Sequence, residues 1–109
     1  MDHKTVEDYI LSMPNSRLEY PFGEGVAVYK TNDKMFALIS EGKLPVRLSL
    51  KCDPVLSKLL RDKYIEVMPG YHLNKKHWNT IVLSGQLPWE EVQGLIRHSY
   101  ELVTGQSKA

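Results

Sequence analysis

The chain has 109 residues, 42% hydrophobic and 25% charged, which is ordinary for one soluble globular domain spanning residues 1–109. Its net charge of +1 excludes strong attraction of nucleic acids or acidic partners by overall charge alone. No apolar run approaches the roughly 18 residues of a membrane span, and the N-terminus lacks the apolar stretch of a secretory signal. Cys52 is the single cysteine, so we expect a reduced, cytoplasmic setting.

The N-terminal segment predicts a helix over residues 4–13. Val6, Ile10 and Met13 fall at helical spacing and form one apolar side. The sequence MPNS at 13–16 ends this helix, because proline disfavours a helical residue before it and Asn-Ser suits a turn.

Strands are predicted next, at 26–30 and 34–40 around a tight hairpin turn, with a short additional strand at 18–22. Residues 46–51 alternate strictly in polarity, which is typical of an antiparallel strand with one buried and one wet face. The buried side would hold Val46, Leu48 and Leu50, and the wet side Arg47, Ser49 and Lys51.

A second helix is predicted after Asp53, a good N-cap, with Pro54 in its first position. Its expected apolar stripe is Val55, Leu56, Leu59 and Leu60. Two strands (65–69 and 78–83) and a final helix from near Pro88 follow, the helix burying Trp89, Val92, Ile96 and Val103. The sequence therefore predicts an α+β fold, an antiparallel sheet of about five to six strands with helices packed on one face.

The stretch PGYHLNKKHWNT at 69–80 has the composition of a site, but metal and catalytic chemistry fit it poorly. His72 and His77 are five residues apart, without a CxxC or HExxH motif. Pairing Cys52 with either histidine would suit a thiol nucleophile, although a small residue just before a helix cap is typical of packing. We predict no metal, no cofactor and no catalytic residue.

Basic residues concentrate in the middle of the chain. Residues 30–79 carry ten basic and five acidic side chains, a net of +5, between segments of −3 and −1. Basic and aromatic side chains on a wet sheet face are a common way to hold nucleic-acid backbones. The candidate contacts are Lys30, Lys34, Arg47, Lys51, Lys75, Lys76 and His77, with Tyr29 and Phe36 expected to pair beside the hairpin turn.

A purely structural interpretation stays open for the same residues. Trp78 is compatible with a core position as well as with the surface, and its neighbours with a solvated loop. Asn74 or Asn79 is expected to bond local backbone. Lysine-rich strand faces also protect sheet edges against aggregation.

Three motifs, YPFG (20–23), LKCDP (50–54) and PGYHLNKKHWNT (69–80), together resemble the MmcQ/YjbR family of small bacterial proteins, from about Asn15 to Val103. Ser49 and Leu73 depart from the family pattern, where asparagine and methionine are usual. The resemblance implies a fold similar to frataxin-like (CyaY-like) proteins and a role in binding DNA, with no catalytic residue to carry over. Frataxin-like iron binding would need a more acidic first helix.

The sequence thus leads to a non-enzymatic DNA-binding module as the first hypothesis. The alternative is a small-molecule or protein-interaction domain, in which the motif residues Tyr71, His72, Trp78 and Asn79, with Arg47, line a groove at the sheet. A thiol-dependent enzyme using Cys52 is a third hypothesis.

Overall fold

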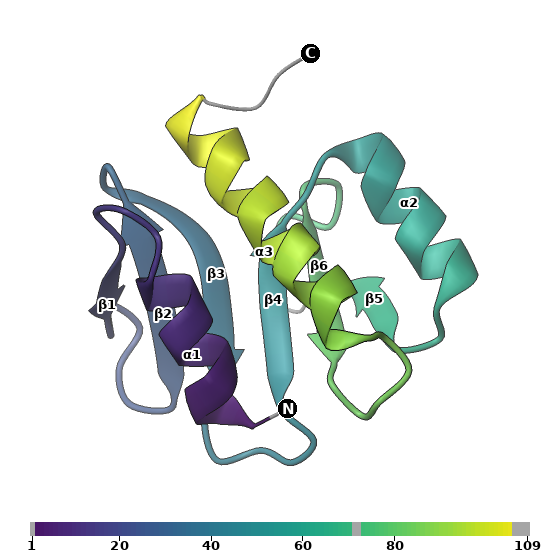
Figure 1. Ribbon diagram of the computed structural model, residues 1–109, viewed down its shortest axis with the longest axis horizontal. Helices are drawn as coiled ribbons and strands as arrows, with labels where there is room; N and C mark the ends of the chain where they lie inside the picture. Colours follow the sequence, from purple (N-terminus) through teal and green to yellow (C-terminus); the bar gives the residue numbers. More distant parts are fainter. Residues whose placement is uncertain (1, 71–72, 106–109) are drawn as a thin grey trace.

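The computed structural model describes residues 2–70 and 73–105, where three helices cover one face of a six-stranded antiparallel sheet (Figure 1). The helices are α1 (His3–Leu11), α2 (Pro54–Lys63) and α3 (Trp89–Thr104). The strands are β1 (Arg17–Glu19), β2 (Val26–Thr31), β3 (Lys34–Ser40), β4 (Arg47–Lys51), β5 (Val67–Pro69) and β6 (Trp78–Val82), in the sheet order β1-β2-β3-β4-β6-β5. The predicted α+β class and element order are confirmed. None of the helices described here combines the length and apolar character needed to cross a membrane.

Side-chain caps fix where the first two helices begin. The Asp2 carboxylate accepts a hydrogen bond from the Thr5 N–H at 2.9 Å, and hydrogen bonds from the Thr5 side chain and from this N–H lower the pKa of Asp2. Asp53 caps α2 by accepting from two backbone N–H groups at 3.0 and 3.1 Å, with Pro54 in the first helical position as predicted. The Asp53 N–H itself donates to His98 Nε2 at 3.1 Å, so the start of α2 is also tied to α3.

The hairpin between β2 and β3 turns at Asn32 and Asp33. Both adopt left-handed backbone angles (φ 52° and 61°), as the two central residues of a type I′ hairpin turn do. The expected pairing of Tyr29 with Phe36 is wrong. A β-bulge at Tyr29 and Lys30 shifts the register, so Tyr29 pairs with Ala37.

The bulge places both aromatic rings beneath the helices. Tyr29 and Phe36 are fully buried, and Phe36 meets the Tyr100 ring of α3 edge-on with centroids 5.5 Å apart. Neither ring is therefore available on the wet side of the sheet. The β4 alternation is confirmed, since Leu48 and Leu50 join this core while Arg47 is exposed on the other face.

The apolar stripe predicted for α2 is only partly correct. Leu60 is buried and Leu56 is half-buried, but the side chains of Val55 and Leu59 are 70% and 60% exposed. Ser57 takes a buried position instead. The helix therefore packs through a narrower side than its sequence suggests and leaves an apolar strip in solvent.

Candidate nucleic-acid interface

None of the three helices lies on the other face of the sheet, called the open face below (Figure 1). Register and alternation place on it Arg17, Glu19, Val26, Val28, Lys30, Met35, Leu38, Ser40, Arg47, Ser49, Lys51, Met68, Trp78, Thr80 and Val82. Arg17, Lys30, Arg47 and Lys51 are basic, and Glu19 is the one acid among these strand residues. The open face is therefore positive in a chain that is almost neutral.

The centre of the open face is formed by β4, which presents Arg47 and Lys51 toward its two ends. Arg47 pairs with Val82 and is exposed, whereas Lys51 pairs with Trp78 and is half-buried. Between them the Ser49 and Thr80 hydroxyls are hydrogen-bonded at 2.8 Å. Neither Arg47 nor Lys51 forms an ion pair with a described residue, so both charges are free for a ligand.

The basic residues near β1 are compensated within the chain. Lys30 Nζ lies 3.2 Å from Glu19, and the Arg17 guanidinium lies 3.6 Å from Glu19 and 2.8 Å from Asp33. Lys34 pairs with Thr31 and, by alternation from Met35, points to the helix side of the sheet. The structure therefore brings Lys30, Arg47 and Lys51 to one face and separates Lys34 from them.

The Trp78 side chain lies on the open face but is buried there and does not project into solvent. Its side chain is 7% exposed and packs in one apolar cluster with Val28 and Leu38. Leu73, from the loop before β6, packs against the same cluster. The question that the sequence left open for Trp78 is thus answered: the residue is buried, although no helix covers it.

The loop of residues 73–77, which leads into β6, is anchored from the other side of the molecule by Arg61 of α2. Arg61 Nε donates to Asn79 Oδ1 at 2.6 Å, and its guanidinium also donates to the carbonyls of Lys75 and Trp78. Asn79 is 2% exposed on the helix side, so it acts in this anchor and lies away from the open face. Sequence reasoning missed Arg61, because no motif distinguishes it from the other basic residues of α2.

Within the loop, local hydrogen bonds fix the backbone and leave the lysines outside. Asn74 Oδ1 accepts from the Lys76 N–H at 2.9 Å, which confirms the predicted local role for Asn74. Lys75 and Lys76 are exposed, while His77 is half-buried and its carbonyl accepts from the Cys52 N–H at 2.8 Å. Since β6 starts at Trp78, which pairs with Lys51, these lysines immediately precede the strand that lies beside Lys51. Tyr71 and His72 lie outside the described residues.

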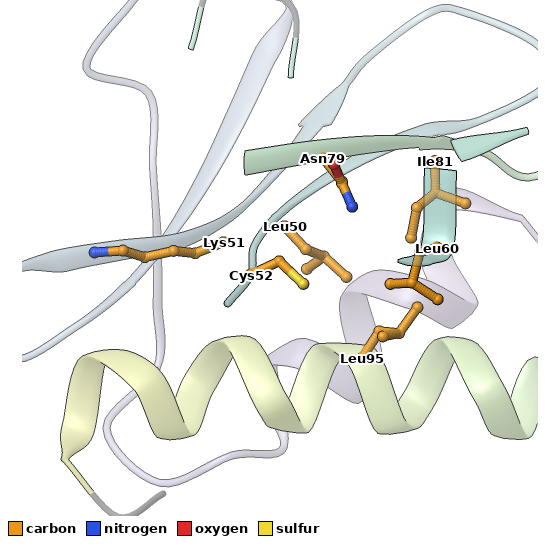
Figure 2. Close-up of a pocket in the computed structure, with 7 residues that line it drawn as sticks. All are labelled: Leu50, Lys51, Cys52, Leu60, Asn79, Ile81 and Leu95. Atoms are coloured by element: carbon orange, nitrogen blue, oxygen red, sulfur yellow. The ribbon is translucent and has the colours of Figure 1, made fainter. Parts of the chain in front are cut away.

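Cys52 lies between the sheet and α3 and is closed to reagents (Figure 2). Its side chain is 4% exposed, and burial raises the pKa of the thiol, which disfavours the thiolate that a nucleophile needs. The adjoining void of about 10 Å³ has room for no more than a water molecule. Its lining is Leu50, Lys51, Cys52, Leu60, Asn79, Ile81 and Leu95.

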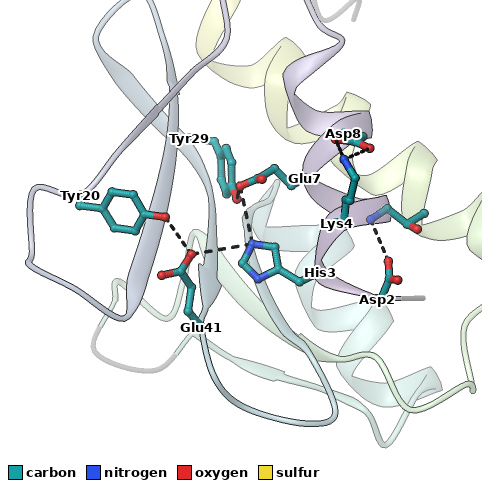
Figure 3. A network of polar contacts seen from close by, with 9 residues as sticks. Asp2, His3, Lys4, Glu7, Asp8, Tyr20, Tyr29 and Glu41 are labelled. Carbon is teal, nitrogen blue, oxygen red and sulfur yellow. Dashed lines mark hydrogen bonds and ion pairs between the residues drawn. The ribbon is translucent and has the colours of Figure 1, made fainter.

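A second polar cluster, on the helix side, ties α1 to the strands (Figure 3). The Tyr29 hydroxyl donates to Glu7 at 2.5 Å, and Tyr20 of the YPFG motif donates to Glu41 at 2.8 Å. His3 Nε2 lies between the two carboxylates, 3.6 Å from Glu7 and 3.9 Å from Glu41. Across residues 2–70 and 73–105, no three His, Cys, Asp or Glu side chains are arranged to hold a metal ion. The contacts of this cluster link α1 to β2 and to the segments around residues 20 and 41, and we interpret its role as structural.

Comparison with known proteins identifies the family. The model of the YjbR family matches residues 11–102. The Escherichia coli O157:H7 protein YbdF is 36% identical over 101 residues, covering 93% of this chain and 83% of that protein. YjbR of Escherichia coli strain K12 is 40% identical over 72 residues, covering 66% of this chain and 61% of YjbR.

Solved structures agree with this assignment. Deinococcus radiodurans protein DR2400, a crystal structure of the domain DUF419, superposes with a TM-score of 0.90 at 37% identity, covering 97% of this chain and 80% of that one. A crystal structure of a Pseudomonas syringae protein gives a TM-score of 0.79 at 31% identity, covering 94% of this chain and 98% of that one. None of these names states an activity. The chain belongs to the YjbR (MmcQ) family.

Proposed function

We propose that the protein is a non-enzymatic module that binds DNA through the open face and the 73–77 loop. The observation that carries the proposal is that basic side chains gather on one face of the sheet, two of them without an ion-pair partner among the described residues. Of the four basic side chains on the open face, Arg17 and Lys30 are paired with Glu19 and Asp33, whereas Arg47 and Lys51 at its centre have no ion-pair partner among the described residues. Lys75 and Lys76 are exposed in the segment that leads into β6, whose first residue, Trp78, pairs with Lys51. Clustering of this kind attracts phosphates even where net charge does not.

The geometry favours duplex DNA over single strands. Proteins that hold single strands without sequence preference stack bases on exposed aromatic rings. On the open face Trp78 is 7% exposed, and Tyr29 and Phe36 are fully buried on the opposite side. Among the described residues the open face therefore offers phosphate contacts but no stacking ring, and affinity should depend mainly on backbone charge.

Fluorescence anisotropy of labelled duplex and single-stranded DNA at two salt concentrations tests the proposal. We expect the double variant Arg47→Glu with Lys51→Glu, and separately Lys75→Glu with Lys76→Glu, to weaken duplex binding at low salt by about tenfold or more. Wild-type affinity should fall steeply with salt.

The matched control is Lys34→Glu with Lys63→Glu. It changes net charge by the same amount through exposed lysines on the helix side of the sheet. We expect its affinity to stay within about twofold of wild type, because its charges lie away from the contact surface. Equal losses in all three variants, or no binding by wild type at low salt, would reject the open face as a DNA site.

The proposal keeps two expectations from the sequence, a frataxin-like fold and a cytoplasmic location. Helices on a single face of an antiparallel sheet support the first expectation. A single, free and buried cysteine supports the second, because thiols are kept reduced in the cytoplasm and proteins there rarely depend on disulfides.

A further inference from the structure

The outer side of α2 exposes more apolar surface than a solvated helix normally does. Val55 and Leu59, one turn apart, are 70% and 60% exposed. They line a shallow hollow of about 300 Å³ together with Pro54, Lys58 and Asp62. A second hollow of about 520 Å³ flanks Leu59 on the side toward Glu91. Leu59 is therefore a ridge between two depressions, as in helices that interlock with another helix.

We propose that a second copy of this chain covers this side of α2, with the two α2 helices antiparallel about a two-fold axis. In this antiparallel arrangement, residue i of one copy lies opposite residue j of the other copy when the two residue numbers add up to a fixed value. The two-fold symmetry then repeats every such pair. Taking the axis near Leu60 places Lys58 opposite Asp62 of the second copy, and Asp62 opposite its Lys58. Leu59 lies one position from this axis, so the two Leu59 side chains lie side by side next to it.

Charge selects this orientation. Lys58 and Asp62 are both exposed, and neither forms an ion pair with any described residue, although they lie one turn apart on α2. A parallel pairing would set Lys58 against Lys58 and Asp62 against Asp62, which is repulsive. The antiparallel pairing creates two attractive pairs around an apolar centre, so the surface is complementary to itself.

The proposed contact is small and independent of the DNA proposal. A single ten-residue helix provides less surface than the roughly 1,200–2,000 Å² of stable interfaces, so the dimer should be weak and depend on concentration. The outer side of α2 belongs to the helix layer, so dimerisation leaves the open face free (Figure 1). A variant that loses dimerisation should therefore still bind DNA, and a variant that loses DNA binding should still dimerise.

Sedimentation equilibrium of the full chain, from micromolar to millimolar concentration, tests the inference. We expect the weight-average mass to rise from 12.5 kDa toward twice that value. Leu59→Glu should keep the protein monomeric throughout the range. Its circular dichroism spectrum should match wild type, because the residue it replaces is mostly exposed.

Charge variants distinguish the proposed pairing from any other apolar contact. Lys58→Glu should weaken the dimer about tenfold, because the new acidic side chain would face Asp62 of the other copy at both symmetry-related pairs. The charge swap Lys58→Glu with Asp62→Lys should restore the wild-type affinity. Leu44→Glu is the control, because Leu44 is 91% exposed but lies between β3 and β4. A wild-type monomer at every concentration, a dimer indifferent to Leu59→Glu, or a charge swap that fails to restore association would overturn the inference.

Discussion

At residue 70 the chain passes so close to Trp78 that a side chain has no room. A Cβ atom on Gly70 would lie 2.8 Å from Trp78 Cβ and 3.2 Å from Leu73 Cβ. We expect Gly70→Ala to lower the free energy of unfolding by about 1–3 kcal/mol, because the loop or the indole must shift to relieve the overlap. Urea unfolding monitored by tryptophan fluorescence measures this change.

Gly94 provides the matched comparison. It lies inside α3, and a Cβ there would meet only the Arg97 guanidinium, at 3.6 Å. Gly94→Ala should therefore raise stability by about 0.5–1 kcal/mol through helix propensity. Equal responses of the two glycines would contradict the close approach of the loop to Trp78.

Two buried hydroxyl and thiol groups make stability sensitive to alkaline pH. Burial raises the pKa of Cys52 above its ordinary 9.0, and burial together with the hydrogen bond to Glu7 raises that of Tyr29 above its ordinary 10.0. The folded state therefore holds both protons more tightly than the unfolded chain does. Their stabilisation is complete below pH 9.0 and is lost as pH rises toward the folded-state values.

We expect the free energy of unfolding to fall above pH 9.0 by up to about 1.4 kcal/mol per pH unit for each group. Cys52→Ala should delay the onset of this decline to the ordinary range of tyrosine, near pH 10.0. Urea titrations between neutral pH and pH 11 measure both curves. An unchanged onset in Cys52→Ala would show that the thiol is not responsible.

At the scale of elements, one side chain joins α2 to β6 and to the 73–77 loop. Arg61 holds the buried amide of Asn79 at 2.6 Å and two backbone carbonyls. We expect Arg61→Ala to cost about 2–3 kcal/mol, because the Asn79 amide oxygen loses its partner in the interior. Hydrogen exchange should also accelerate at residues 73–77.

Lys63→Ala on the same helix is the control for this prediction. The Lys63 side chain is exposed, with its ammonium 5.1 Å from the Tyr64 ring centre, so its loss should change stability by no more than about 0.5 kcal/mol. If Arg61→Ala leaves stability and exchange in the loop unchanged, the loop is held by its own hydrogen bonds alone.

Local patterns predicted the elements well, and tertiary contacts explain where prediction failed. The β4 alternation and the Asp53-Pro54 cap are properties of neighbouring residues, and both are confirmed. The bulge at Tyr29 is different, since it lets Phe36 reach Tyr100, a residue far along the chain. In α2 the apolar pattern alone does not reveal that Val55 and Leu59 remain exposed.

At the scale of the whole molecule, the same limit applies to the candidate site. Charge patterning located Arg47, Lys51, Lys75 and Lys76, because strand alternation and loop polarity are visible in sequence. It did not show that Glu19 neutralises Lys30, since that pairing depends on the β1–β2 register. Nor did charge patterning show that Trp78 and Asn79, which are neighbours in the sequence, lie on opposite faces of the sheet.

The order of strands in the sheet also has a consequence for how the chain reaches its native state. Strands β1 to β4 pair with their sequence neighbours, as Ser40 does with Arg47, so these contacts close short loops. The next pairing joins Arg47 to Val82, which are separated in the sequence by α2 and β5. Because loop closure becomes entropically more costly with length, the meander should form in the folding transition state and β6 afterwards. The open face would then be completed last, when β6 docks and places Trp78 beside Lys51.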